Sequence, residues 1–221
     1  MRRTTLALVL AGALVMAAGL VPMSPAHAIP PPPTLLCAND FSTANLTGWS
    51  QSGGRWTVAD GTYQQTARTS SNARSWFQAE WFAHSATARV KLVSASRSSS
   101  FIAFNIGVRG ASTSYRLVLS ARSVARLESV RDGAVTVLAS QALPVAAGTW
   151  YTINMGQSQT QISALVDGAW LFGGTVNLPA GAHHLGGVGF TTAHASGAFD
   201  DLTVIHYGPS TEPRCPTTPP A

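Results

Sequence analysis

Three Asp-Gly pairs lie between short runs of alternating apolar and polar residues: Asp60-Gly61, Asp132-Gly133 and Asp167-Gly168. A two-residue hairpin turn of type I′ requires positive φ at both central positions, which Asp tolerates and Gly adopts freely. Each pair therefore indicates two antiparallel strands joined by a tight turn. Three such turns in one chain predict an antiparallel protein built from strands.

The segments beside these turns alternate with the period of two that is typical of strands. In residues 86–92 the alanines, valine and leucine are predicted to face inward, and the Thr, Arg and Lys between them outward. The even-numbered residues from Ile102 to Val108 share an apolar face, which leaves Arg109 on the opposite face. No stretch of ten residues after residue 28 has a helical period. The sequence predicts an all-β fold in which two antiparallel sheets form a β-sandwich or jelly roll.

The first 28 residues have the pattern of a secretory signal peptide. Arg2 and Arg3 precede an apolar stretch at 6–20, and Ala26-His27-Ala28 supplies the small-x-small cleavage pattern. An uncleaved membrane anchor is the alternative, although the apolar stretch is short for a membrane span. We expect a secreted, extracellular protein that has no membrane contact after cleavage.

The rest of the chain divides by composition into a proline-rich spacer at 29–34, one continuous β-sandwich domain at 35–207 and a Pro/Thr-rich tail at 208–221. Loss of residues 1–28 removes two arginines and no acid, so the formal charge falls from +5 to +3. The remaining basic residues are scattered and do not alternate with aromatics, which excludes a typical nucleic-acid surface. We expect a monomer.

The chain has two cysteines, Cys37 near the start of the mature sequence and Cys215 in the tail. In an exported protein an isolated pair is most simply a disulfide. This bond would join the two ends of the sandwich. Metal binding by two lone thiols is a poor alternative, because partner ligands are missing.

Motifs spread along the chain resemble, in order, those of the concanavalin A-like lectin/glucanase superfamily. The version they most resemble is the laminin G-like jelly-roll module of secreted bacterial proteins. One motif is Gly-Arg-Trp-Thr-Val-Ala-Asp-Gly-Thr-Tyr at 54–63; the others lie at 40–41, 48–49, 106–109, 115–117, 148–151, 166–168, 187–190 and 199–204. The resemblance implies two curved sheets whose concave face often holds sugar. It does not specify a ligand, because this fold hosts many functions.

Aromatic rings and planar polar groups are the side chains that recognise sugars. Arg109 and Tyr115 match an Arg and a Tyr that recur on adjacent strands of similar modules, and Arg109 is predicted to project from the concave sheet. The alternative for Arg109 is a cross-strand packing or ion pair. Further candidates for ligand contact lie in a segment with several aromatic rings: Trp76, Trp81 and the nearby Glu80. Trp170, which follows the third Asp-Gly turn, is another candidate. Burial in the core is the alternative for these rings.

Catalytic residues are not predicted. The three glutamates, Glu80, Glu128 and Glu212, form no Glu-x-Asp-x-x-Glu motif of the laminarinase-type members. Adjacent Asp200 and Asp201 are expected on opposite faces of a strand. His183 and His184 are interpreted as a solvent-exposed loop pair, and His84, His194 and His206 as isolated.

The resemblance also implies a structural Ca²⁺ ion, and no other cofactor is predicted. Asp40 and Asp200 or Asp201 match the acidic positions near the two chain ends, and Gly61 could offer its carbonyl. The alternative is that Asp40 caps a turn and the Asp pair faces solvent.

Together these features predict a secreted, non-catalytic carbohydrate-binding module whose partner is a polysaccharide or oligosaccharide. Two alternatives stay open at this point. One is a hydrolase of the same fold, such as a glycoside hydrolase or a 3-keto-glycoside hydrolase-like enzyme, which would need a pocket with carboxylate, Arg and His. The other is a structural or adhesion module.

Overall fold

Sixteen strands and no helix make up the part of the chain that the computed structural model describes, residues 31–215. The predicted signal sequence, the start of the spacer and the last six residues of the tail lie outside the described residues. No helix that could cross a membrane occurs between residues 31 and 215.

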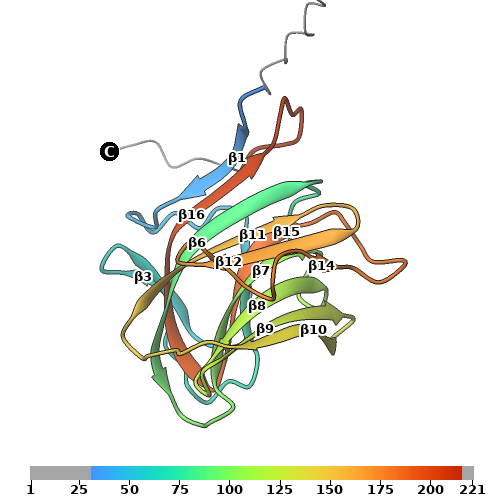
Figure 1. Cartoon of the computed structure of the whole chain (residues 1–221). Coiled ribbons are helices and arrows are strands. Elements are labelled where there is room, and N and C mark those ends of the chain that lie inside the picture. Colours follow the sequence, from blue (N-terminus) through green and yellow to red (C-terminus); the bar gives the residue numbers. More distant parts are fainter. Residues whose placement is uncertain (1–30, 216–221) are drawn as a thin grey trace, which may run out of the picture. The chain divides into compact units, whose positions relative to one another are not determined.

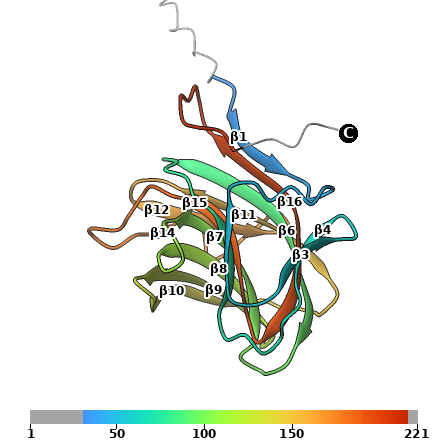
Figure 2. The same cartoon turned by 180° about the vertical axis from the view of Figure 1, so that it is seen from behind.

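The strands form two antiparallel sheets that lie face to face as two layers (Figure 1), and Figure 2 shows the same layers from behind. The nine-stranded sheet has the order β13-β12-β11-β6-β16-β4-β3, with β1 beside β16 and β14 beside β12. Its strands are β1 (Thr34–Asn39), β3 (Trp56–Ala59), β4 (Thr62–Gln65), β6 (His84–Ala95), β11 (Trp150–Gln157), β12 (Gln161–Val166), β13 (Ala169–Trp170), β14 (Val176–Asn177) and β16 (Ala195–His206).

The seven-stranded sheet has the order β10-β9-β8-β7-β15-β5-β2. Its strands are β2 (Trp49–Ser52), β5 (Ala73–Phe77), β7 (Phe101–Val108), β8 (Ser114–Ser120), β9 (Val124–Arg131), β10 (Ala134–Ala142) and β15 (Gly187–Ala193). The predicted all-β, two-sheet antiparallel sandwich is confirmed.

The Asp-Gly turns occur where the sequence predicts them. Asp60, Asp132 and Asp167 have φ of 53°, 51° and 49°, and the glycine after each is also positive. They connect β3 to β4, β9 to β10 and β12 to β13, each an antiparallel pair. Local backbone preference therefore fixes three hairpins of the fold.

The core lies between the sheets and is rich in aromatic rings. Phe190 of the seven-stranded sheet stacks on Phe199 of the nine-stranded sheet, with ring centroids 4.3 Å apart. The predicted inward residues of β6, from Ala86 to Leu92, are all buried in this core. On β7, Ile102, Phe104 and Ile106 join the core as predicted.

Val108 departs from the predicted alternation. The register of β7 against β15 shifts between Gly187 and Val188, and Gly107 there has φ of +60°. This bulge adds one residue, so the side chains that follow change face. Val108 accordingly lies outside the core cluster, and the prediction that it shares the face of Ile106 is wrong.

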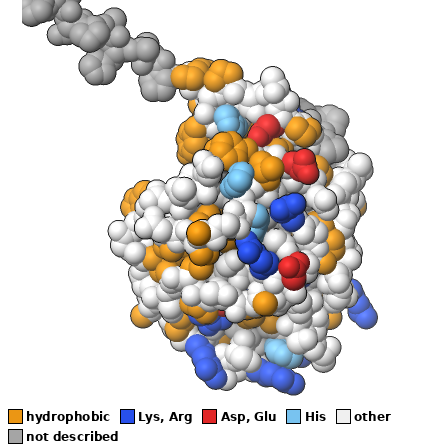
Figure 3. All heavy atoms as spheres, turned by 90° about the vertical axis from the view of Figure 1, so that its right-hand side faces the viewer, with side chains coloured by type: hydrophobic (Ala, Val, Ile, Leu, Met, Phe, Trp, Pro, Cys, Tyr) orange, Lys and Arg blue, Asp and Glu red, His pale blue; other side chains and the backbone are white. Residues whose placement is uncertain are grey.

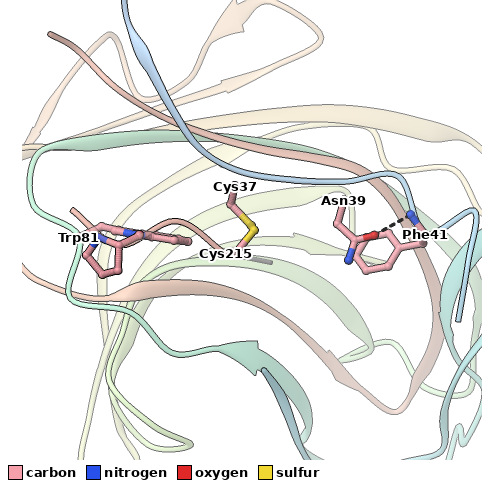
Figure 4. The surroundings of a disulfide bond; sticks show 6 residues. Cys37, Asn39, Phe41, Trp81 and Cys215 are labelled. Carbon is pink, nitrogen blue, oxygen red and sulfur yellow. Dashed lines mark hydrogen bonds between the residues drawn. A yellow bond between two sulfur atoms is a disulfide. The ribbon is translucent and has the colours of Figure 1, made fainter. Parts of the chain in front are cut away.

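The two ends of the described chain are joined, as predicted, by a disulfide between Cys37 and Cys215 (Figure 4). The backbone N–H of Cys215 donates to the Leu36 carbonyl at 2.9 Å. The indole N–H of Trp81 donates to the Pro213 carbonyl at 2.7 Å, and Trp81 is 0% exposed. The segment before Cys215 is thus tied to β1 and to Trp81.

His84 begins β6 and lies opposite His206 of β16, so these two histidines are not isolated as the sequence suggested. The His84 side chain is buried. Burial lowers the pKa of His84 to about 4; the Trp81 carbonyl opposes this shift, and His206 adds to it. His84 is therefore neutral in the folded protein at pH 7.

Acid is expected to destabilise the protein through His84. In the unfolded chain, His84 has an ordinary pKa of about 6.5 and binds a proton below that pH. In the folded chain, His84 becomes protonated only near pH 4. Stability from this group is therefore present above pH 6.5 and falls as pH decreases, by about 3 kcal/mol at pH 4. Urea unfolding between pH 7 and 4 measures this loss. In His84→Phe the pH slope should flatten, and an unchanged slope would contradict the assignment.

Candidate functional site

A cleft of about 740 Å³ lies at one end of the seven-stranded sheet. Four segments that connect its strands meet there: 78–83 after β5, 109–113 between β7 and β8, the β9–β10 turn, and 178–186 before β15. Because neighbouring strands are antiparallel, these connections all lie at the same end of the sheet, where the strands begin or terminate. Figure 3 views the molecule from the side on which loop 178–186 projects in Figure 1, and basic, acidic and histidine side chains gather in the middle of that face.

The charged side chains of the cleft are two arginines and two carboxylates. Arg109 and Glu80 are exposed, and neither has a side-chain partner among the described residues. Arg131 donates from Nη2 to the Gly181 carbonyl at 2.6 Å, and Asp132 follows it in the turn. The cleft therefore contains equal numbers of positive and negative side chains. Of these, Arg109 and Glu80 have side chains that are available to bind a ligand.

His183 forms part of the cleft wall and is held from several sides. Its ring stacks on the Tyr115 ring with centroids 4.3 Å apart, and its Nε2 lies 2.9 Å from the Gly107 carbonyl. Its own carbonyl accepts hydrogen bonds from the Tyr115 hydroxyl at 3.0 Å and from Gln157 at 3.1 Å. These contacts fix the imidazole in one orientation.

The protonation state of His183 follows from this position. Burial lowers its pKa, the Gly107 carbonyl opposes the change, and the cations Arg109 and Arg131 lower the pKa further. In the neutral ring, Nε2–H donates to Gly107, which leaves Nδ1 as an acceptor. The prediction of a solvent-exposed histidine pair is therefore wrong for His183.

Gly107 is required at the base of this arrangement. Its φ is positive, and a Cβ there would lie 2.6 Å from Oε1 of Gln157, a residue that also contacts His183. A side chain at position 107 would push Gln157 away and strain the bulge. The bulge also places Arg109 in the connection after β7. Arg109 thus lies at the rim of the sheet and does not extend from its strands as predicted.

An apolar patch made by Phe82 and Leu185 adjoins the cleft. The two residues form an isolated backbone bridge, both are partly exposed, and Leu185 also lines the cleft. The His184 ring packs edge to face against Phe82, with centroids 5.5 Å apart. A flat ring therefore lies next to the charged groups.

The predicted ligand residues are only partly brought together. Arg109 and Glu80 line the cleft. Tyr115 and Trp81 are buried, so the sugar contacts predicted for their rings are wrong; Tyr115 instead supports His183. Trp76 is half-buried on β5, and exposed Trp170 lies on β13 of the other sheet; neither lines the cleft.

Sequence reasoning missed Arg131, Asp132 and His183 as cleft residues. The Asp132-Gly133 turn located two of them on a hairpin but did not indicate what the hairpin faces. The missing information is the packing of the 178–186 loop, which has no local signal beyond its two glycines and its proline.

The predicted calcium ligands do not fit a metal site. Within residues 31–215 no three acidic, histidine or cysteine side chains gather as a metal would require. Nη1 of Arg89 lies 3.2 Å from the Asp201 carboxylate and 3.8 Å from that of Asp200. Burial raises the pKa of Asp200, and the Asp201 and Asp40 carboxylates raise it further, against Arg89. Gly61 lies in the β3–β4 turn.

Asp200 and Asp201 also differ from the predicted arrangement on opposite faces. The register of β16 against β6 shifts between Asp200 and Thr203, and Asp201 has φ of +49°. This irregularity turns both carboxylates toward the same arginine. Arg89 is thus the cation that balances them.

The two-layer architecture is that of the concanavalin A-like lectins and glucanases, and the chain has this jelly-roll fold. Similar solved structures include carbohydrate-binding module CBM66 from Bacillus subtilis, with a TM-score of 0.65 and 15% identity over 73% of this chain and 98% of that one. The laminarinase catalytic domain from Thermotoga maritima matches with a TM-score of 0.61 and 11% identity over 79% and 98%. The Emp47p carbohydrate recognition domain matches with a TM-score of 0.58 and 12% identity over 79% and 95%.

No protein-family model and no curated protein matches the sequence. The structural neighbours thus include both binding modules and glycoside hydrolases, and at these identities they establish the fold alone.

Proposed function

We propose that this chain is a secreted, non-catalytic carbohydrate-binding module. Export would remove residues 1–28, and residues 35–207 would form the binding domain. The proposal depends mainly on the cleft, where hydrogen-bonding side chains from four connections converge at the edge of a jelly-roll sheet. Sugar hydroxyls need paired donors and acceptors, which Arg109, Glu80 and His183 supply.

Two further features agree with this function. The exposed Phe82 ring beside the cleft suits the C–H face of a second sugar unit, so the ligand is an oligosaccharide or polysaccharide. The disulfide between Cys37 and Cys215 agrees with an oxidising, extracellular location.

Arg109→Ala is expected to weaken polysaccharide retention about tenfold, because one charge-assisted hydrogen bond contributes roughly 1.5 kcal/mol. Affinity electrophoresis in gels that contain laminarin, β-1,3-1,4-glucan or polygalacturonate, chosen after a glycan array, measures the retention. Arg97→Ala is the matched control, since Arg97 is exposed and its side chain makes no contact among the described hydrogen bonds and ion pairs. Retention that is equal in both variants would remove Arg109 from the site.

A hydrolase is the second candidate, because carboxylates, arginines and a neutral histidine line the same cleft. We expect no release of reducing ends from the retained polysaccharide. Release that disappears in both Glu80→Gln and Asp132→Asn, while retention persists, would identify an enzyme in place of a binding module.

A further inference from the structure

The outer edge of β10, the last strand of the seven-stranded sheet, carries no further strand. β10 pairs with β9 on one side, and within residues 31–215 no strand lies on its other side (Figures 1 and 2). It runs from Ala134 to Ala142, and seven of these nine residues are exposed. Its sequence contains no charged residue, no proline and no glycine. An edge of this kind can accept another strand.

The other edges of the two sheets are short or covered. β13 has two residues, and β2 and β3 have four each. β1 is longer, but its Leu36 carbonyl accepts a hydrogen bond from the backbone N–H of Cys215, so the tail segment lies along it. Short and covered edges protect a sheet against strand pairing. Of the strands that the structure describes, β10 therefore has the one long edge without such cover.

The first half of β10 presents backbone groups on this edge. Arg131 and Ala134 flank the two-residue Asp132-Gly133 turn and face each other, so they form a hydrogen-bonded pair. Along an antiparallel ladder such pairs alternate with pairs that share no hydrogen bond. The backbone N–H and C=O groups of Val135 and Val137 therefore point away from β9. Neither residue takes part in the turn and loop hydrogen bonds between residues 31 and 215.

The side chains of the same two residues are apolar and exposed. Val135 is 49% and Val137 is 51% exposed, and residues two positions apart lie on one face of a strand. The register against β9 shifts between Val137 and Ala139, and the strand bends at such a bulge. The bulge limits regular pairing to the residues before it. This short segment favours an extended, apolar partner.

We infer that the partner is a second copy of this chain, paired through the same segment. In an antiparallel pair with a two-fold axis at Thr136, Val135 of each copy lies opposite Val137 of the other. Both residues have outward backbone groups, so each of the two pairs exchanges both hydrogen bonds, and the valines meet across the join. Arg131 and Asp132 of one copy lie beside uncharged residues of the other, so no like charges meet.

The inferred dimer differs from the monomer expected from the sequence, because sheet order decides which strand lies at an edge. The paired segment is short, so the interface belongs to the small and weak class, and we expect a dissociation constant of roughly 10–100 µM. The β9–β10 turn also lines the cleft, so the dimer carries two clefts on opposite sides of its axis. If the clefts bind sugar as proposed, a long polysaccharide that reaches both is retained more strongly.

Sedimentation velocity of the purified protein, from about 5 µM to about 1 mM, measures the association. We expect a shift from monomer to dimer as concentration rises. Amide hydrogen exchange locates the contact: the N–H groups of Val135 and Val137 should exchange at least about threefold more slowly at the high concentration than at the low one.

Three variants test the edge. Val137→Lys places a charge in the join and should raise the dissociation constant at least about tenfold. Val135→Pro removes an outward N–H but no hydrogen bond to β9, so it should have the same effect. Val93→Lys is the matched control and should dimerise like the native protein. Val93 is 47% exposed but lies on β6, which β11 and β16 flank on both sides.

A monomer at every concentration would overturn the inference, whether or not another protein binds the edge. A dimer that both edge variants leave unchanged, or that Val93→Lys abolishes, would overturn it too. If one edge variant does not fold, the other variant and the exchange of the native protein decide the question. The test contains no carbohydrate, so it is unaffected by a failure of polysaccharide retention at the cleft, and the two proposals fail separately.

Discussion

Replacement of both Cys37 and Cys215 by alanine is expected to lower the free energy of unfolding by about 4–5 kcal/mol. The disulfide spans 178 residues of sequence, so it removes a large part of the conformational freedom of the unfolded chain. The midpoint of urea unfolding of the double variant, compared with the native protein, measures this loss.

Reduction supplies the control for this prediction. A thiol reductant should shift the native protein toward the midpoint of the double variant and leave the double variant unchanged. Trp81 reports the local consequence, because its indole donates to Pro213, two residues before Cys215. Loss of the bond should expose Trp81 and shift its fluorescence to longer wavelength. An unchanged midpoint would show that other contacts of β1 already hold the chain ends together.

Glu128→Gln is expected to destabilise the protein by about 3–5 kcal/mol. Glu128 is 3% exposed and accepts hydrogen bonds of 2.7 Å from Nε of Arg116 and from Nε of Arg126. Arg116 is 6% exposed and also lies over the Phe101 ring, so it cannot turn to water when its partner loses charge. The variant leaves a buried guanidinium without an anion, and chemical denaturation measures the cost.

Glu80→Gln is the matched control, because Glu80 is exposed and has no ion pair among the described residues. The free energy of unfolding of this variant should stay within about 0.5 kcal/mol of that of the native protein. The double variant Arg116→Met, Glu128→Leu should recover most of the loss, since apolar residues of similar volume can replace a buried ion pair. A loss below about 1 kcal/mol for Glu128→Gln would show that the pair is open to water.

Much of the fold could be predicted from the sequence, because its signals are local. The conformation of Asp60-Gly61 depends on two residues, and the inward face of 86–92 depends on a period of two. The disulfide was predictable because only two cysteines are present. Where a bulge intervenes, as at Gly107 and after Asp200, the same alternation gave wrong faces for Val108 and for the Asp pair.

The cleft was harder to predict, because its residues come from four separate connections. Arg109 and Glu80 were found by residue type and by family resemblance. His183 was placed wrongly because its environment depends on Tyr115 and Gly107, some seventy residues earlier in the chain. From the sequence, the rings of Trp81 and Tyr115 were predicted to contact sugar. In the structure, the tail segment packs over Trp81 and His183 stacks on Tyr115, so both rings are buried.

By itself, the sequence determined the strand class, the three hairpin turns and the pairing of the cysteines, because backbone preference and composition act over a few residues. Only the tertiary structure decided which polar side chains share a cavity. Register shifts, loop packing and burial set those positions, and these depend on contacts between residues far apart in the chain.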